Sequence, residues 1–278
     1  KRFVSIWFRH LATDWFTLRQ PAQTKATGDL RNMPFVLRSL SHGRMVITAA
    51  NATAEIKGIR KGMVLADVRA IHPDLVVMDD KPDLAGRLLK RLAEWCIRFT
   101  PVVSVDPPDG LLLDVTGCPH LWGGDQAYVE AIVKKIGDRG YHVRVALADT
   151  PGVAWAVARF GDEPVIPVGK HVDALLPLPP EALRLEAETV DRLHKLGLHQ
   201  IRQFIRMPRS SLRKRFGQHV IMRLDMASGQ QTEVIEPVQP IVPYQERLPC
   251  LEPIVTATGI AIAMQQLLNT LCLRLQQE

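Results

Sequence analysis

One short stretch, residues 102–116, constrains the fold most, because its pattern predicts two strands joined by a tight turn. Residues 102–105 are mostly valine, and residues 111–115 form a second apolar run. The Pro-Pro-Asp-Gly between them is typical of a turn, since proline presets φ and glycine accepts the positive φ that closes a tight reversal. Asp106 then ends one strand and Asp109 lies in the turn. An acidic hairpin on an α/β sheet is where metal-dependent phosphoryl-transfer enzymes hold divalent ions.

The elements predicted around this hairpin follow a regular order. A strand is predicted over residues 3–8, and Asp83 begins a helix that runs to Phe99 with leucines at helical spacing on one face. After the hairpin come a helix over 125–138, a strand over 142–148 and a helix that Pro151 begins and Phe160 ends. The order strand, helix, strand, strand, helix, strand is that of the ferredoxin-like split βαβ arrangement. The predicted fold class is α+β.

A small mixed unit interrupts this order after the first strand. Residues 20–33 are polar and predict a loop, whereas residues 34–37 and 45–48 predict two strands. A helix is predicted over 49–59, ending at Gly58, and another over 63–71 before a strand at 75–78. The helix pattern that follows Arg9 leads from the first strand into this insert.

The second half of the chain contains no strand pattern. Residues 165–180 are rich in proline, which indicates a domain boundary, and residues 181–229 predict short helices. Residues 234–253 carry five prolines and predict a linker. Residues 256–275 predict an amphipathic helix. Its Gln-Gln-Leu-Leu at 265–268 is superficially similar to a clamp-binding peptide, but the helical spacing of the leucines favours core packing. Since the sequence stops inside this helix, we expect an excerpt of a longer protein.

Composition excludes several classes of protein. The 278 residues include 46% hydrophobic and 23% charged residues, which describes a folded chain with two to four modules. Four cysteines lie far apart without a Cys-x-x-Cys pattern, which argues against a zinc site and a disulfide scaffold and fits a reducing cytoplasm. No apolar run reaches about 18 residues, so no membrane span is expected. The net charge of +6 favours a polyanionic partner only weakly.

A stronger signal for such a partner is a basic segment around Leu196-Gly197-Leu198, which joins two predicted short helices. Such a hairpin offers backbone N–H groups and a helix N-terminus to a phosphate. We expect sequence-independent contact with a DNA backbone here; the alternative is an ordinary solvated helix face. The predicted DNA-binding residues are Lys195, Gly197, Leu198, Arg202, Arg206, Arg209, Arg213, Lys214, Arg215 and Arg223.

These motifs together resemble the Y-family (translesion) DNA polymerases. Ser104-Val105-Asp106, followed by Leu113-Asp114-Val115-Thr116, resembles the palm motif of that family. Residues 58–63 with 73–77 resemble its fingers segment, and residues 193–198 resemble its thumb helix-hairpin-helix. The resemblance spans nearly the whole chain.

Within this family the chain most resembles the ImuB branch. The residues that indicate it are Pro108 to Cys118, His120-Leu121, Gly123-Gly124, and Ala148 to Gly152 with Ala154-Trp155-Ala156. The resemblance implies a palm at 1–9 and 78–164, fingers at 10–77 and a helix-hairpin-helix thumb at 165–232. It also implies a linker and the truncated beginning of a little finger at 233–278.

The family's two-metal site is incomplete in this chain. Two divalent ions need about three carboxylates together with the substrate phosphates. Trp7 and Arg9 stand where the resemblance places metal ligands at the end of the first strand, and a guanidinium repels a cation. Asp106 matches the third acidic position of the family's metal site, but Pro107 stands where the family has a glutamate directly after it. On their own, Asp106 could equally be a turn or cap residue and Asp109 a turn residue.

The residues that would handle a nucleotide differ as well. The tyrosine and arginine of the family's fingers helix correspond to Ala52 and Glu55, and Glu55 would repel a triphosphate. The bulky gate residue that the family has near the start of its first helix corresponds to Leu11-Ala12. The family's palm lysine, which faces the triphosphate, has no counterpart in residues 149–152. Asp14 lies too far along the first helix for a metal site, and an N-cap or solvent-exposed role is favoured. We therefore predict no catalytic residue, no metal site and no cofactor.

The resemblance implies a function for such a protein. By this resemblance, the protein is expected to be a catalytically inactive subunit of a bacterial mutagenic translesion complex in the cytoplasm, associated with the nucleoid. Its implied partners are DNA, an ImuA-type protein, an error-prone C-family polymerase and the sliding clamp, the last mainly through further C-terminal sequence. Two alternatives stay open. One is an active polymerase that uses Asp106 with atypical Mg²⁺ ligands, and the other is a plain DNA-binding repair module.

Overall fold

The structure is a computed structural model that describes residues 1–19, 30–239, 245–250 and 252–277. It divides into two units, Lys1–Val238 and Gln239–Glu278, which are described separately. Among the described residues, no helix combines the length and apolar character that a membrane crossing requires. The domain boundaries expected inside the first unit stay predictions.

The names palm, fingers and thumb are kept for the segments that were predicted as such, and the first of these contains a four-stranded antiparallel sheet. Its strands are β1 (Phe3–Trp7), β5 (Val102–Asp106), β6 (Gly110–Asp114) and β7 (Arg144–Ala148), in the order β5-β6-β1-β7. With β1 central and the β5–β6 hairpin on one side of it, this is the predicted ferredoxin-like arrangement. Because side chains alternate along a strand, Val4 and Ile6 enter one core while Phe3 enters the other.

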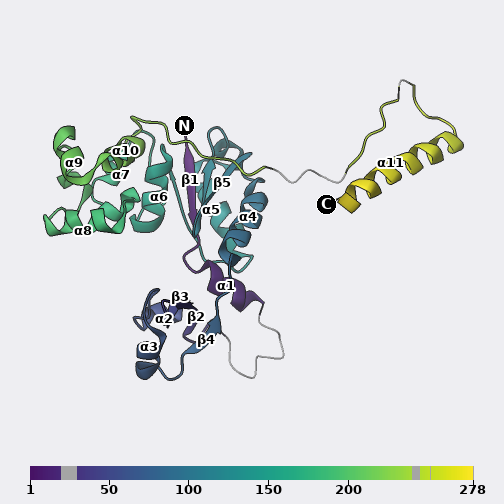
Figure 1. Cartoon of the computed structure of the whole chain (residues 1–278). Coiled ribbons are helices and arrows are strands. Elements are labelled where there is room, and N and C mark those ends of the chain that lie inside the picture. The colour runs from purple at the N-terminus through teal and green to yellow at the C-terminus, as the bar shows by residue number, and fades with distance from the viewer. Residues whose placement is uncertain (20–29, 240–244, 251, 278) are drawn as a thin grey trace. The chain divides into compact units, whose positions relative to one another are not determined.

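Helices cover both faces of the sheet (Figure 1). One face packs against α4 (Leu84–Cys96) and α5 (Asp125–Gly137), and the opposite face packs against α6 (Pro151–Phe160). The predicted start of α4 is correct, but Asp83 has a φ of 57° and its side chain does not cap the helix. The helix also ends at Cys96 rather than at Phe99.

The hairpin between β5 and β6 forms as predicted, with one difference at its glycine. Asp106 pairs with Gly110, and the loop between them contains a cis Pro107–Pro108 peptide bond. Gly110 is not at positive φ. It belongs to β6, so its missing side chain leaves room for the side chains of Asp106 and Arg159 and is not needed to close the turn.

The fingers contain a second sheet of three strands. Its strands are β2 (Phe35–Ser41), β3 (Arg44–Ala50) and β4 (Val76–Asp79), in the order β3-β2-β4, accompanied by the helices α1 (Leu11–Leu18), α2 (Ala52–Ile56) and α3 (Leu65–Ile71). The helix predicted from residue 49 begins later, because Asn51 caps α2 by accepting a hydrogen bond from the Ala54 N–H. Most of the loop predicted at 20–33 lies outside the described residues.

The thumb consists of short helices, as predicted. They are α7 (His171–Leu175), η3 (Pro180–Leu183), α8 (Ala187–Lys195), η4 (Ile201–Gln203), α9 (Arg209–Phe216) and α10 (Gln218–Ala227). Their apolar side chains form one continuous core with α6 and one face of the palm sheet. The Thr150 hydroxyl caps α6 and also donates to the Ala227 carbonyl, and Gly152 leaves room for the α10 backbone.

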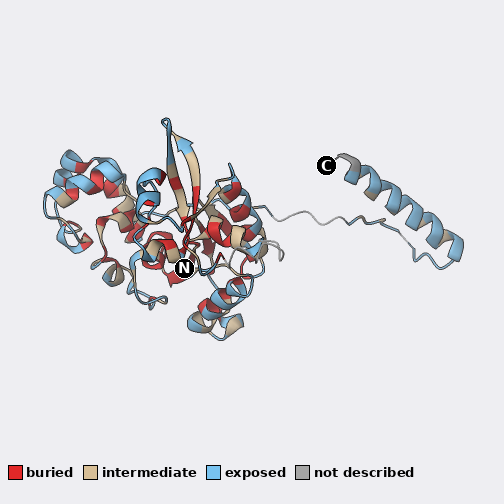
Figure 2. Cartoon of the chain, turned by 90° about the horizontal axis from the view of Figure 1, so that it is seen from below, coloured by how far each residue is buried: buried red, intermediate tan, exposed pale blue. Residues whose placement is uncertain are grey.

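The second unit contains one long helix, α11 (Ala257–Gln277), which is drawn as mostly exposed in Figure 2. Leu267 and Leu271 of this helix are half-buried, whereas Leu268 is 51% exposed and Leu275 is 49% exposed. The core packing expected for its leucines stays a prediction. Arg274 forms an ion pair with Glu246 at 3.4 Å within this unit.

Candidate functional site

The end of the acidic hairpin is occupied by an arginine from α6. Arg159 donates to Asp109 at 2.8 Å, and the same nitrogen lies 3.4 Å from a carboxylate oxygen of Asp106. Trp7, at the end of β1, donates its indole N–H to the other oxygen of Asp109 at 2.9 Å. The structure therefore unites both predicted acidic residues with Trp7 and with an arginine that the sequence analysis did not identify. We call these four residues the Arg159 cluster.

The guanidinium of Arg159 is enclosed by its neighbours. Its side chain is only 8% exposed, and its guanidinium carbon lies 4.1 Å from the ring centre of Trp155 and 5.6 Å from that of Trp7. Burial lowers the pKa of Arg159 from its usual value, and the two carboxylates oppose that shift. An arginine has a pKa high enough to remain charged under these conditions, so the cluster contains a fixed internal cation.

Gly110 makes this arrangement possible. A Cβ added at residue 110 would lie 2.8 Å from a carboxylate oxygen of Asp106 and 2.9 Å from a guanidinium nitrogen of Arg159. Both distances are shorter than a non-bonded contact allows. The glycine that the sequence assigned to turn geometry therefore provides the space in which Arg159 meets Asp106.

The donor set at this hairpin does not fit Mg²⁺. That ion requires hard oxygen ligands in near-octahedral geometry, whereas here a guanidinium already binds both carboxylates and an indole N–H occupies a further oxygen. Within the described parts of the chain, no three or more His, Cys, Asp or Glu residues are grouped to hold a metal ion. No step of nucleotidyl transfer can be derived from this set of residues.

Two further predicted positions meet at the junction between palm and fingers. Arg9 forms an ion pair with Glu55 of α2 at 2.7 Å, with side chains 51% and 30% exposed respectively. His10 lies 3.8 Å from the same carboxylate and 3.0 Å from the Ala50 carbonyl. Ala52, at the start of α2, is exposed. The two side chains whose charges were predicted to oppose a metal ion and a triphosphate thus pair with each other.

Two other acidic residues have structural partners. Asp14 is buried and accepts a hydrogen bond from the backbone N–H of His142 at 2.9 Å, so the N-cap or solvent role expected for it is wrong. Asp149 pairs with Arg2 at 2.8 Å and accepts from the Gly169 N–H at 2.6 Å. Burial opposes ionisation of Asp149, but these contacts outweigh it and lower its pKa. Leu11, at the gate position, lies in the palm core.

The hairpin between α8 and η4 uses its own backbone N–H groups. The N–H groups of Gly197 and Leu198 donate to carbonyls of α8, and those of His199 and Gln200 donate to the side chain of Gln203. The expectation that this loop offers N–H groups to a phosphate is therefore not met. The junction at Gly217 differs, because no side chain caps the N-terminus of α10 there.

The predicted thumb cations divide into two groups. Arg209 pairs with Asp225 at 2.5 Å, and Arg223 pairs with Glu233 at 3.3 Å, so both are engaged internally. The other six are exposed and form no ion pair within the described parts of the chain: Lys195, Arg202, Arg206, Arg213, Lys214 and Arg215. The last three lie in the last turn of α9, shortly before the start of α10, where no side chain caps the helix.

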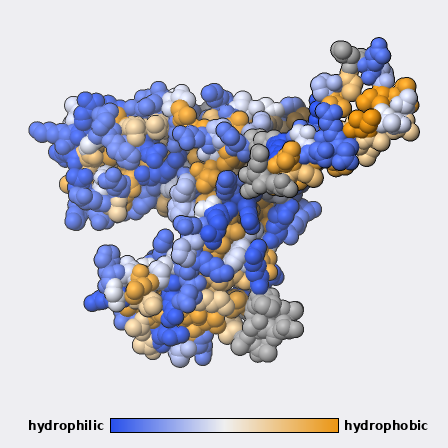
Figure 3. Space-filling view, turned by 45° about the vertical axis from the view of Figure 1, so that its right-hand side comes forward, coloured by the Kyte–Doolittle hydropathy of each residue, from blue (hydrophilic) through white to orange (hydrophobic). Residues whose placement is uncertain are grey.

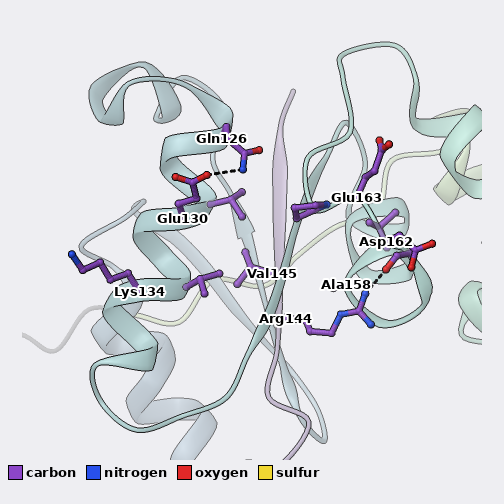
Figure 4. Close-up of a pocket in the computed structure, with 13 residues that line it drawn as sticks. Gln126, Glu130, Lys134, Arg144, Val145, Ala158, Asp162 and Glu163 are labelled. Atoms are coloured by element: carbon purple, nitrogen blue, oxygen red, sulfur yellow. Dashed lines mark hydrogen bonds between the residues drawn. The ribbon is translucent and has the colours of Figure 1, made fainter.

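A groove of about 380 Å³ lies elsewhere on the palm, between α5 and α6 beside β7 (Figure 4). Val145 and Ala158 contribute to its apolar floor, while Glu130, Lys134 and Glu163 lie around it. It contains none of the predicted site residues. Arg144 donates to the Gly161 carbonyl across one end.

Comparison with known proteins assigns this architecture to a family. Residues 17–159 match the model of the impB/mucB/samB family. The chain is 40% identical over 222 residues to Protein ImuB of Caulobacter vibrioides (strain NA1000 / CB15N), covering 80% of this chain and 48% of that protein. It is 28% identical over 201 residues to DNA polymerase IV of Moorella thermoacetica, covering 68% and 49% respectively. The chain thus spans about half the length of these relatives.

Solved structures show the same fold. DinB from Sulfolobus solfataricus superposes with a TM-score of 0.69 at 18% identity, covering 85% of this chain and 70% of that one. The insertion ternary complex of Dbh DNA polymerase gives the same four values. Because the matched family model covers half of the sequence, the chain belongs to the impB/mucB/samB family of Y-family polymerase-like proteins.

Proposed function

We propose that this protein is a catalytically inactive, polymerase-like subunit that binds DNA in a bacterial translesion complex. The observation that carries the proposal is the Arg159 cluster, in which a buried guanidinium binds Asp106 and Asp109. A divalent ion at this place would have to displace a cation that the fold itself supplies. The ion pair between Arg9 and Glu55 supports the same conclusion at the nucleotide side of the site.

The thumb supports the DNA-binding part of the proposal. Arg213, Lys214 and Arg215 are exposed at the end of α9, next to the uncapped N-terminus of α10. Cations beside backbone N–H groups suit phosphate oxygens and carry no sequence information. We therefore assign non-specific backbone contact to this end of the thumb, and leave out Arg209 and Arg223 because carboxylates already bind them.

The similarity to Protein ImuB supports the proposed partners. We propose that the protein brings together an ImuA-type protein, an error-prone C-family polymerase and the sliding clamp. Since the chain covers 48% of that relative, we assign the clamp contact mainly to sequence that corresponds to the other half.

Primer extension tests the proposed inactivity. The chain is incubated with a primed template, the four deoxynucleotides and either Mg²⁺ or Mn²⁺, and we expect no extension above a protein-free control. Extension that disappears in Asp106→Ala would show that Asp106 supports catalysis and would overturn the proposal. A Y-family polymerase assayed in parallel confirms that the substrates are competent.

A binding titration tests the thumb assignment. Lys214→Glu combined with Arg215→Glu should weaken the binding of labelled duplex DNA and lower the slope of log affinity against log salt by about 2, at roughly 0.9 per phosphate contact. Unchanged affinity and slope would contradict the assignment. Lys57→Glu combined with Lys61→Glu removes two exposed cations from the fingers and is the charge-matched control.

A further inference from the structure

A second cationic surface lies on the palm, on the side of the sheet that α4 covers. Arg87, Arg91 and Trp95 follow one another at intervals of four residues, so they lie on one face of the helix. The helix contains three basic residues, Arg87, Lys90 and Arg91, and one acidic residue, Glu94. Figure 3, which brings the right-hand side of Figure 1 forward, shows strongly hydrophilic residues interspersed with apolar ones on this face of the molecule.

Tryptophan rings hold the cations at both ends of this surface. Arg19 and Lys81 lie 4.7 Å and 4.8 Å from the ring centre of Trp15. At the other end, the guanidinium carbons of Arg98 and Arg139 lie 4.1 Å and 4.3 Å from the ring centre of Trp95. Arg98 also donates its Nε–H to the Trp95 carbonyl at 2.8 Å, which leaves its two terminal nitrogens for a ligand. Stacking on a ring orients a cation without using its N–H donors, so the remaining donors stay available to an anion.

A cavity of about 250 Å³ lies at the Trp15 end of this surface. Arg19, Lys81, Arg87 and Arg91 line it together with Trp15. In the part of the chain that the structure describes, none of these four cations forms an ion pair, and the same holds for Arg98 and Arg139. Four like charges around one cavity repel each other, and this repulsion falls when an anion binds between them.

We propose that the six cations Arg19, Lys81, Arg87, Arg91, Arg98 and Arg139, here named the α4 surface, bind the phosphate backbone of a second stretch of DNA. Five of the six are arginines, whose planar fork matches phosphate oxygens. Phosphate contacts of this kind are independent of base sequence. Since both ring systems already hold cations, the α4 surface contacts the backbone and does not stack bases.

The α4 surface is separate from the thumb. The thumb helices share the core of α6 on one face of the sheet, whereas α4 belongs to the core on the opposite face. A straight duplex bound at α9 cannot pass through the sheet to reach α4. The inference rests on the proposed DNA-binding role, and it adds that two DNA segments, or one that bends around the palm, contact the protein.

Binding titrations with matched variants test the inference. Arg87→Glu with Arg91→Glu is compared with the full chain, with the thumb variant Lys214→Glu/Arg215→Glu and with the fingers control Lys57→Glu/Lys61→Glu. The probes are a labelled single strand and a labelled duplex. We expect roughly tenfold weaker binding of at least one probe by the α4 variant, and a salt slope smaller by about 1.4 for the single strand or about 1.8 for the duplex.

The outcomes separate this inference from the proposed function. Unchanged affinity and slope for both probes in a folded α4 variant, with the thumb variant impaired, would overturn the inference and leave the proposed function intact. Loss in both variants, with the fingers control unaffected, is the expected result. If polyglutamate binds the wild-type chain and this binding is lost in an α4 variant that still binds DNA normally, the surface recognises an acidic polypeptide and the inference is wrong. Circular dichroism confirms folding of each variant.

Discussion

Arginine plays opposite parts at the palm hairpin and on the α4 surface. Arg159 is 8% exposed, and one of its guanidinium nitrogens binds both Asp106 and Asp109. Arg87 and Arg91 are exposed and form no ion pair within the described residues. Trp155 lies against the first arginine in the same way that Trp15 and Trp95 lie against the cations of the second region.

The difference between these regions is the presence of carboxylates. Where acidic residues face the guanidinium, its charge is satisfied inside the fold and the region stabilises the structure. Where they do not, the charge must be satisfied by water, salt or a ligand, and the region becomes a candidate binding surface. The number of cations alone therefore does not distinguish a binding surface from an internal ion pair, whereas the pairing does.

Removing the internal cation should have the largest effect on stability. Arg159→Ala leaves Asp106 and Asp109 without their counter-ion, and breaking a buried pair on one side costs about 3–5 kcal/mol. Because Asp109 is 33% exposed, we expect a loss nearer to about 3 kcal/mol, measured by urea unfolding.

Two comparisons sharpen this prediction. Arg159→Lys keeps the charge but loses the planar guanidinium that lies against Trp155, so its loss of stability should be smaller than that of Arg159→Ala. Added Mn²⁺ should recover part of the stability of Arg159→Ala and leave the wild type unchanged, because only the variant has unpaired carboxylates. If the free energy of unfolding of Arg159→Ala lies less than about 1 kcal/mol below that of the wild type, the cluster contributes no more than a surface ion pair.

Filling the space beside the cluster should have the next largest effect. Gly110→Ala places a Cβ against Asp106 and Arg159, and overpacking of this kind costs about 1–3 kcal/mol. Gly86→Ala is the control, since this glycine lies in α4 with no atom within 4 Å of an added Cβ, and alanine is the better helix former. Urea unfolding should show a loss for the first variant and no loss for the second.

A smaller, pH-dependent contribution is expected from Asp149. Its pKa is lower in the folded state, so its ionised form stabilises the fold above the unfolded pKa of about 3.9 and this stabilisation is lost as the pH falls through the folded value. Asp149→Asn should be about 1 kcal/mol less stable than the wild type at pH 7. The difference should shrink below about pH 4. A difference that is constant between pH 7 and pH 3 would contradict this reasoning.

The smallest effect is expected where an ion pair is open to solvent. Arg9 and Glu55 are 51% and 30% exposed, so Glu55→Gln should change the free energy of unfolding by about 0–0.5 kcal/mol. The same substitution has no predicted effect on the Arg159 cluster. A loss comparable to that of Arg159→Ala would mean that exposure does not set the strength of these pairs.

The sequence predicted those features that depend on neighbouring residues. The β5–β6 hairpin follows from two apolar runs around a turn, and α6 begins at Pro151 and ends at Phe160 as the pattern indicates. The order of strands then defined the ferredoxin-like sheet. The same local reasoning failed at residues 49–51, because pairing with β2 keeps Ala49 and Ala50 in a strand.

The sequence did not reveal pairings between distant residues. Arg159 is separated by 50 residues or more from the carboxylates it binds, and no periodicity connects them. One signal was present, since Arg159 is the sole charged residue of the otherwise apolar α6. Likewise, the basic composition of the thumb did not show that Arg209 and Arg223 face carboxylates, or that Gln203 occupies the N–H groups of the α8–η4 hairpin.

The shared core between α6 and the thumb has a mechanical consequence. Phe204, Leu212 and Leu224 of the thumb belong to the same core as Val153 and Val157 of α6, and the Thr150–Ala227 hydrogen bond closes the contact. A thumb joined in this way cannot swing as a separate clamp without exposing apolar surface to water. If DNA binds at α9 as proposed, it is held at a fixed distance from the palm sheet, so the packing between α6 and the thumb sets that distance.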